Sequence, residues 1–206
     1  MLSKNLLLIF TRNPELGKCK TRLAVNVGDQ IALDIYKFLL NHTVSITKNL
    51  SATKTVYYSE NVWENDIWDS TIFLKKLQNG SDLGYRMQRA FQEGFEDGFE
   101  KIIIIGSDLF DLSENDIENA FSALNDAEFV LGPAEDGGYY LLGMKYLEPN
   151  VFKNKAWGTN TVLQDTLTDL KNKKTTFLER RNDIDIYDDI KDVPAFKSFL
   201  KKYKND

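Results

Sequence analysis

Four consecutive isoleucines at positions 102–105 constrain the fold of this chain more than any other feature. Side chains branched at Cβ favour an extended backbone, and successive residues of a strand point to opposite faces of a sheet. This strand is therefore apolar on both faces. A strand of that kind belongs in the middle of a sheet that is covered on both sides.

Expected strands and helices alternate along most of the chain, which is typical of a mainly parallel sheet flanked by helices. We expect strands at residues 6–11, 55–59, 72–77, 101–105, 129–132, 139–144 and 176–178. We expect helices at residues 28–50, 83–99, 113–124, 161–170 and 187–202, the last one interrupted by Pro194. Ser113 and Asp116 form a capping-box pattern, and the Asp-Gly step at 136–137 can close a hairpin.

The length and composition set the outer limits of the organisation. A chain of 206 residues with 42% hydrophobic content suits one domain over residues 1–206, with a frayed tail at about 203–206. The single cysteine, Cys19, excludes an internal disulfide bond and indicates a reducing compartment. The apolar run at residues 6–10 is too short for a secretion signal or for a membrane span of roughly 20 residues. We therefore expect a cytoplasmic protein without a membrane partner.

The net charge of −5 argues against a nucleic-acid partner. A cluster of basic residues stands out against this acidic background. Arg12, Lys18, Lys20 and Arg22 lie within one stretch of 11 residues after the first expected strand. Gly17 in the same stretch lets a ligand approach the backbone closely. The cluster is either a local anion site or a solvated loop, and it lacks the pattern of a P-loop.

Carboxylates follow three other expected strands. Asp108 follows the isoleucine strand, Asp136 stands before two glycines, and Asp183 and Asp185 follow a late strand. Ligands of open α/β sheets lie outside the carboxyl ends of the strands. Each carboxylate could instead cap a helix or close a turn. Together with the basic cluster, however, they form a layout that can hold a phosphate-bearing substrate through a bridging metal.

The nucleophile chemistry of serine or cysteine triads has no support here. His42 is the only histidine, and it falls on the apolar stripe of its expected helix. We therefore predict that His42 is a packing residue, which leaves Cys19 and every serine without a histidine partner.

Six ordered segments of the chain resemble the radical-SAM/selenodomain-associated transferases, a group within the nucleotide-diphospho-sugar transferase superfamily. The segments are F-x-R-x-P-x-x-G-K-x-K-T-R-L at 10–23, Q-x-G-x-D-L-G-x-R-M at 78–87, GSD at 106–108, GPAEDGGYYLLG at 132–143, W-G-T-x-T-V-L at 157–163 and D-I-D-x-x-x-D at 183–189. The resemblance implies the GT-A fold, a Rossmann-like α/β arrangement of three layers. In this chain Leu109 and Phe110 stand where the family has a proline soon after GSD, so the resemblance gives Asp111 no role.

The resemblance also implies roles for individual residues. It places Lys18, Lys20 and Arg22, with Arg12 and Gly17 of the same loop, at the nucleotide phosphates. It makes Asp108 a ligand of Mg²⁺ or Mn²⁺, with Asp185 as a second ligand. It lines the donor and acceptor pocket with Asp82, Arg86, Asp136, Gly137, Gly138, Tyr139 and Trp157.

The leading hypothesis is a metal-dependent glycosyltransferase that uses a nucleotide-sugar donor and a small-molecule acceptor. Asp136 is the candidate for the base on the acceptor side. One alternative is a nucleotidyltransferase that resembles 2-phospho-lactate guanylyltransferases and acts on a nucleoside triphosphate and a phosphorylated acceptor. A second alternative is a nucleotide-binding module without turnover.

Overall fold

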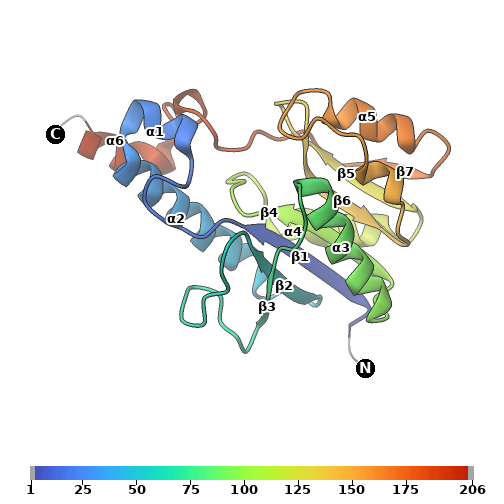
Figure 1. The fold of residues 1–206 in the computed structure, drawn as a ribbon. Coiled ribbons are helices and arrows are strands. Elements are labelled where there is room, and N and C mark those ends of the chain that lie inside the picture. Colours follow the sequence, from blue (N-terminus) through green and yellow to red (C-terminus); the bar gives the residue numbers. More distant parts are fainter. Residues whose placement is uncertain (1–2, 204–206) are drawn as a thin grey trace.

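The computed structural model describes residues 3–203, and within this range seven strands form one sheet (Figure 1). The strands are β1 (Asn5–Thr11), β2 (Thr53–Tyr58), β3 (Phe73–Leu77), β4 (Lys101–Gly106), β5 (Phe129–Pro133), β6 (Tyr139–Met144) and β7 (Thr175–Phe177). All seven were predicted from the sequence, with bounds that differ by at most a few residues.

The helices of the same range are α1 (Thr21–Val27), α2 (Asp29–Thr47), α3 (Leu83–Glu96), α4 (Glu114–Ala123), α5 (Val162–Asp169) and α6 (Lys197–Tyr203). Three short 3₁₀ turns accompany them: η1 (Pro149–Phe152), η2 (Tyr187–Asp189) and η3 (Pro194–Phe196). The predicted capping box of α4 is present, because Ser113 and Asp116 each accept from the other's backbone amide.

The strand order is β3-β2-β1-β4-β6-β5-β7, so the isoleucine strand β4 is the central strand, as predicted. Strand β6 is antiparallel to its neighbours β4 and β5, and every other pairing is parallel. The carboxyl ends of β1, β2, β4 and β5 therefore lie at one edge of the sheet. That edge is where an open α/β sheet holds its ligands.

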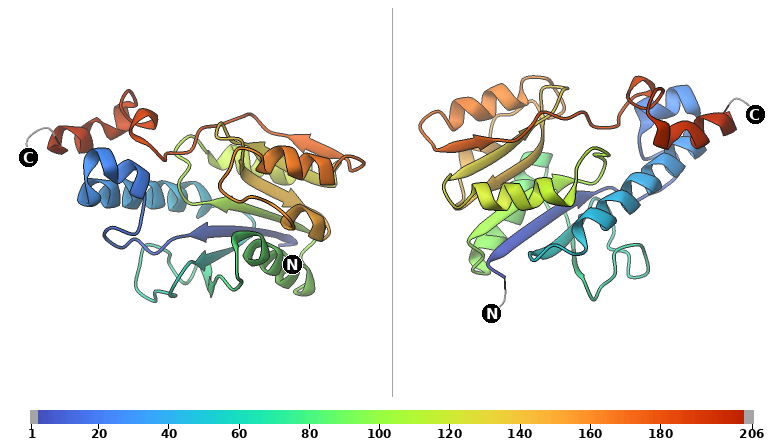
Figure 2. Two further views of the ribbon diagram at one scale, coloured as in Figure 1. Left: turned by 45° about the horizontal axis from the view of Figure 1, so that its top comes forward. Right: turned by 180° about the vertical axis from the view of Figure 1, so that it is seen from behind.

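Helices cover both faces of the sheet, and the views in Figures 1 and 2 agree on this arrangement. Ile103 and Ile105 point to the face covered by α2 and α4, and Ile102 and Ile104 point to the face covered by α3 and η1. The isoleucine run is buried on both faces for this reason. The three-layer α/β architecture predicted from the sequence is confirmed.

A third apolar cluster joins α1 and α2 to the C-terminal segment through residues that include Leu23, Ile35, Ile184 and Phe196. The predicted helix over residues 187–202 does break at Pro194 as expected, but the segment before α6 forms the 3₁₀ turns η2 and η3, so the prediction of a helix there is wrong. Pro194 has no amide hydrogen and its ring blocks the preceding turn, so it starts η3 instead of continuing a helix. Helix α1 and turn η1 were not predicted from the sequence.

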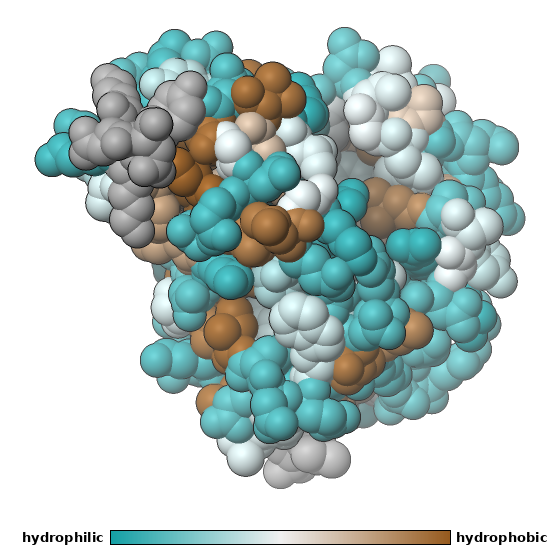
Figure 3. Space-filling model, turned by 60° about the vertical axis from the view of Figure 1, so that its left-hand side comes forward, coloured by the Kyte–Doolittle hydropathy of each residue, from teal (hydrophilic) through white to brown (hydrophobic). Residues whose placement is uncertain are grey.

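On the face drawn in Figure 3, hydrophobic residues stand singly or in small groups between hydrophilic ones. Among residues 3–203, no helix combines the length and the apolar character that crossing a membrane would require. The single domain over residues 1–206 stays a prediction. The expected fraying concerns 203–206, of which 204–206 lie outside the described residues.

Candidate functional site

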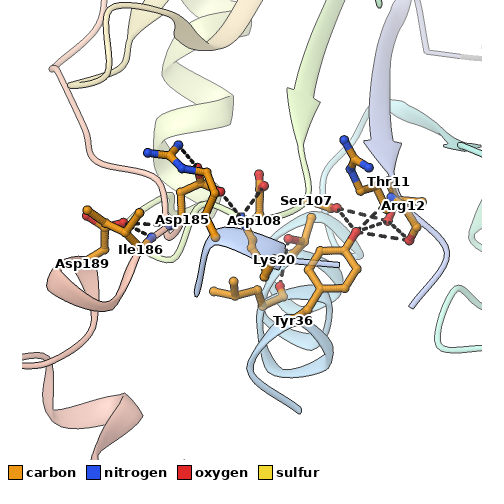
Figure 4. Close-up of polar contacts among 12 residues, drawn as sticks. Thr11, Arg12, Lys20, Tyr36, Ser107, Asp108, Asp185, Ile186 and Asp189 are labelled. Atoms are coloured by element: carbon orange, nitrogen blue, oxygen red, sulfur yellow. Dashed lines mark hydrogen bonds and ion pairs between the residues drawn. The ribbon is translucent and has the colours of Figure 1, made fainter. Parts of the chain in front are cut away.

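The loops that follow β1 and β4 meet because these strands pair in parallel, with Phe10 opposite Gly106. A buried hydroxyl cluster joins the two strand ends to helix α2 (Figure 4). The phenol oxygen of Tyr36 lies 3.2 Å from the hydroxyls of both Thr11 and Ser107, and Ser107 donates to Thr11 at 3.1 Å. This cluster fixes the backbone directly before the basic loop on one side and directly before Asp108 on the other.

Lys20 contacts both carboxylates that the sequence suggested as metal ligands, Asp108 and Asp185 (Figure 4). Lys20 Nζ donates to Asp108 Oδ2 at 2.8 Å and lies 3.7 Å from Asp185 Oδ1. Arg22 donates to the other oxygen of Asp185. The cations and carboxylates of the prediction therefore form one charged cluster at the edge of the sheet.

The Lys20 side chain is the most buried member of this cluster, with 5% exposure against 39% for Asp108. Burial disfavours its ammonium form, but the carboxylates of Asp108 and Asp185 outweigh that effect and raise the pKa of Lys20. Its backbone is left-handed, with φ of 49° and ψ of 43° directly before α1. Lys20 is thus charged, and the surrounding structure holds it in a backbone conformation that residues other than glycine rarely adopt.

A cavity of about 250 Å³ opens beside the charged cluster. Its walls come from β1, β4, β6, the first turns of α3 and the segments at 134–140, 157–162 and 183. The lining residues are Phe10, Leu83, Met87, Ile104, Ile105, Gly106, Asp108, Leu109, Ala134, Asp136, Gly138, Tyr139, Tyr140, Trp157, Gly158, Thr159, Val162 and Asp183. Asp108 belongs to both the cavity wall and the charged cluster, so the two features form one site.

Asp183 enters this site because the chain after β7 runs past the ends of β5 and β4. Arg181 pairs with Ala134 in a parallel bridge, and the amide of Ile184 donates to the carbonyl of Asp108 at 3.4 Å. Burial, together with the charges of Asp108 and Asp136, raises the pKa of Asp183 from 3.8 to about 6. The carboxylates of Asp108 and Asp136 therefore lie close enough to Asp183 to disfavour its ionisation.

Asp136 is held by the turn between β5 and β6. The amide of Gly138 donates to Asp136 Oδ1 at 2.8 Å. Gly137 has a φ of 88°, and a Cβ atom there would lie 2.4 Å from the carbonyl oxygen of Asn160. The Gly-Gly pair thus permits the hairpin that the sequence suggested and seats it directly against the segment before α5.

Trp157 and Tyr139 form one side of the cavity. Their rings meet edge to face, with centroids 6.5 Å apart. A Cβ atom on Gly84 would lie 2.7 Å from the Trp157 indole, so the absence of a side chain there lets the ring lie against α3. The phenol oxygen of Tyr139 is buried and has no hydrogen-bond partner in the described part of the chain, and burial raises its pKa.

Other predicted site residues lie outside the cavity wall. Lys18 pairs with Glu15 and Glu60 on the surface. Asp82 caps α3 by accepting from the amide of Tyr85, and Arg86 donates to the carbonyl of Gly80. The motif at 78–87 reaches the cavity through Leu83 and Met87, which the sequence did not single out. Apolar residues in the first two turns of α3 were the only available signal for them.

Arg12 and Gly17, the remaining predicted residues of the basic loop, are not among the lining residues of the cavity beside the charged cluster. Arg12 lines a second cavity together with Lys37 and Trp63. Gly17 has a φ of 73°, which fits the turn before Lys18. Cys19 is buried and free, so this loop is anchored in the core between its charged residues.

The departure from the family motif after GSD has a packing explanation. Leu109 is buried and lines the cavity, while Phe110 packs against Phe38 and Phe196. His42 packs on Phe110 with ring centroids 5.2 Å apart, and its Nε2 lies 2.9 Å from the carbonyl oxygen of Leu112. The prediction that His42 is a packing residue is confirmed.

The donor set suits a hard divalent cation, for which carboxylate oxygens are the preferred protein ligands. Burial and the charges of Asp108 and Asp136 raise the pKa of Asp183 and so disfavour its carboxylate form, which a bound cation would favour. Within the described residues, however, no three histidine, cysteine or acidic side chains lie close enough together to hold a metal by themselves. Such a site would need phosphate oxygens as further ligands.

Solved structures share this architecture. A provisionally named nucleotide-diphospho-sugar transferase from Desulfovibrio desulfuricans G20 is 28% identical, with a TM-score of 0.85 over 98% of this chain and 96% of that one. A cytidylyltransferase from Leptospira borgpetersenii is 13% identical, with a TM-score of 0.56 over 98% and 94% of the two chains. Rv0371C from Mycobacterium tuberculosis H37Rv, in complex with manganese, is 10% identical, with a TM-score of 0.53 over 96% and 98%.

These likenesses confirm the predicted GT-A-like fold, and the last two show the fold alone. The comparison with curated proteins gives no match. Residues 43–159 match a family of uncharacterized proteins conserved in bacteria, DUF2064, over more than half of the chain. The chain therefore belongs to the DUF2064 family.

Proposed function

We propose that this protein is a metal-dependent transferase that takes a nucleotide-sugar donor and moves its glycosyl group to a small-molecule acceptor. One observation carries the proposal: Asp108 belongs both to the cluster with Lys20 and to a cavity that also contains Asp136 and Asp183. A phosphate-binding part and a reaction pocket thus share one carboxylate. The relative with 28% identity supports the same class of reaction.

Lys20 and Arg22 would bind the donor phosphates. In the free protein their charges are balanced by Asp108 and Asp185. A diphosphate offers more negative charge than a carboxylate, and charge-assisted hydrogen bonds to it are among the strongest in proteins. The cations can therefore exchange partners when the donor binds.

Asp108 and Asp183 are the residues that would hold Mg²⁺ or Mn²⁺, with Asp185 retained as a proposed further ligand. When bound, the ion would offset the charge that develops on the leaving nucleoside diphosphate. Asp183 carries the more perturbed carboxyl, since its pKa lies near 6. It was named beside Asp185 in the sequence, but only its position in the cavity gives it this role.

Asp136 remains the proposed base on the acceptor side. The Gly138 amide fixes one of its oxygens while the carboxylate faces the cavity. A base held in this way can accept a proton from an acceptor hydroxyl without first reorganising.

Nucleotidyl transfer is the second candidate, because a cytidylyltransferase shares the fold over 98% of this chain. That likeness reaches no further than the fold, so it weighs less than the more identical relative. We also propose that the protein is related to the radical-SAM/selenodomain-associated transferases and that it is cytoplasmic.

The small products separate the candidates. Incubation with Mn²⁺, a panel of sugar nucleotides and nucleoside triphosphates, and an extract supplying acceptors should release a nucleoside diphosphate and no pyrophosphate, as followed by phosphorus NMR. Asp108→Asn should abolish this release. Asp111→Asn, a matched change of an exposed carboxylate in the same loop, should not. Stoichiometric pyrophosphate that depends on Asp108 would establish nucleotidyl transfer instead.

A further inference from the structure

The charged residues of the cavity wall all have one sign. Asp108, Asp136 and Asp183 line the cavity, and no lysine, arginine or histidine within residues 3–203 does. A phosphorylated ligand in this space would meet carboxylates, and the one cation beside them in the described part of the chain, Lys20, is paired with Asp108 and is not part of the wall. Phosphate-binding sites in proteins instead present arginine, lysine or backbone amides to the anion.

The cations near the site are engaged elsewhere. Lys20 and Arg22 contact Asp108 and Asp185 outside the apolar part of the wall. Arg180 donates to the carbonyl of Ala134, and Arg181 pairs with Asp116. Each of these cations is thus paired with a group of the protein, and none of them lines the cavity.

The rest of the wall is mainly apolar. Phe10, Leu83, Met87 and Ile104 contribute aliphatic and aromatic surface, and Trp157 adds a broad flat ring. Rings of this kind bind ligands through one apolar face while leaving the ligand's polar edge free.

Trp157 is positioned by the fold. Its indole lies against Gly84 of α3 and meets Tyr139 edge to face. The Trp157 ring occupies the space that a side chain at position 84 would need, so it packs directly against the backbone of α3. The position of the ring therefore does not depend on a flexible side chain. The Trp157 ring can therefore act as a fixed binding surface in the cavity that the three carboxylates also line.

We propose that the acceptor is an uncharged molecule that carries a hydroxyl group and an apolar ring face, such as a glycoside, and that phosphorylated acceptors are rejected. This inference rests on the proposed function. The ring lies on Trp157, and its hydroxyl points toward Asp136. Asp136, which is not among the proposed metal ligands, provides the discrimination against a phosphate through like-charge repulsion, and no lysine, arginine or histidine among the described residues of the cavity wall offsets it.

The test compares phenyl β-D-glucoside with its 6-phosphate, a pair that differs by one phosphate group. Calorimetry in Mn²⁺ with a saturating nucleoside diphosphate should give an affinity for the neutral glycoside that is roughly tenfold higher or more. Equal or tighter binding of the phosphate would overturn the inference, as would binding of nucleotide without any binding of neutral glycosides across a panel of sugars. Absence of nucleotide binding would refute the proposed function itself.

Two variants locate the binding. Trp157→Ala should weaken glycoside binding roughly tenfold and leave nucleotide diphosphate affinity unchanged, whereas Trp63→Ala should change neither. Thr159→Lys introduces a cation into an exposed part of the wall and should reverse the preference toward the 6-phosphate. This second variant keeps the test decisive if Trp157→Ala fails to fold. Unaltered discrimination in Thr159→Lys would contradict the inference.

Discussion

The ammonium nitrogen of Lys20 lies 2.8 Å from Oδ2 of Asp108, so the basic loop after β1 and the end of the central strand are joined by an ion pair. The same ammonium reaches Asp185 at 3.7 Å. In the free protein, Lys20 therefore takes the place at Asp108 that a divalent cation would need. Under the proposed function, metal and lysine would compete for one carboxylate, and a bound phosphate would give the lysine another partner.

Replacing Lys20 with methionine should change two affinities in opposite directions. Mn²⁺ alone should bind more tightly because the competing ammonium is gone. A nucleoside diphosphate should bind roughly tenfold more weakly, or about 1.4 kcal/mol, because a charge-assisted contact is lost. Calorimetric titrations of the two ligands measure both effects.

Lys191→Met is the matched control, since Lys191 makes an exposed ion pair of the same length, 2.8 Å, with Asp188. It should leave both affinities unchanged. If Lys20→Met weakened Mn²⁺ and nucleotide binding equally, competition at Asp108 would be refuted.

Asp183→Asn should stabilise the free protein at neutral pH. Its folded pKa of about 6 lies above the ordinary 3.8, so the folded state holds this proton more tightly than the unfolded chain. The free energy of unfolding of the wild-type protein therefore falls as the pH rises from 4 to 6. Above pH 6 the loss is about 1–2 kcal/mol, after allowance for the partial exposure of the Asp183 side chain.

Thermal melts at pH 7 and pH 4 measure this effect. The gain in Tm for Asp183→Asn should be present at pH 7 and absent at pH 4. Asp126→Asn, at an exposed aspartate, should stay within about 0.5 kcal/mol at either pH. A gain of the same size at both pH values would show that charge is not its cause.

Two tyrosine-to-phenylalanine changes should have opposite effects on stability. Tyr36→Phe removes a hydroxyl that bridges Thr11 and Ser107, and should cost about 1–3 kcal/mol. Tyr139→Phe removes a buried hydroxyl that has no partner within residues 3–203, and should leave stability unchanged or raise it by about 1 kcal/mol. Urea unfolding of both variants tests this contrast, and a large loss in Tyr139→Phe would contradict it.

Alanine at two glycines with similar positive φ values should separate steric clash from backbone strain. Gly158→Ala, at a φ of 81° with open space around it, should cost about 1–2 kcal/mol. Gly137→Ala adds a contact of 2.4 Å with Asn160 and should cost more, and it should also displace Asp136. Chemical denaturation measures the stability loss in each variant, and the transferase assay measures the effect of displacing Asp136. Equal stability losses in the two variants would show that the turn at Gly137 relaxes to avoid the clash.

Much of the fold was predictable from the sequence because its signals are local. The isoleucine run at 102–105 specifies a strand with two buried faces, and Ser113 with Asp116 specifies a helix start. The C-terminal segment was not predictable in this way. Its apolar residues fit a helix pattern with a break at Pro194, but the segment packs against α1 and α2 as two 3₁₀ turns, η2 and η3, followed by the short helix α6.

The sequence by itself determined which residue types stand at the ends of the strands: cations after β1, and carboxylates after β4, β5 and β7. Only the tertiary structure decided how they pair. Asp183 and Asp185 are two residues apart, yet the path of the chain past Asp108 puts the first into the cavity and the second against Lys20 and Arg22. Strand pairing between residues about a hundred positions apart sets these distances, and no local pattern in the sequence encodes them.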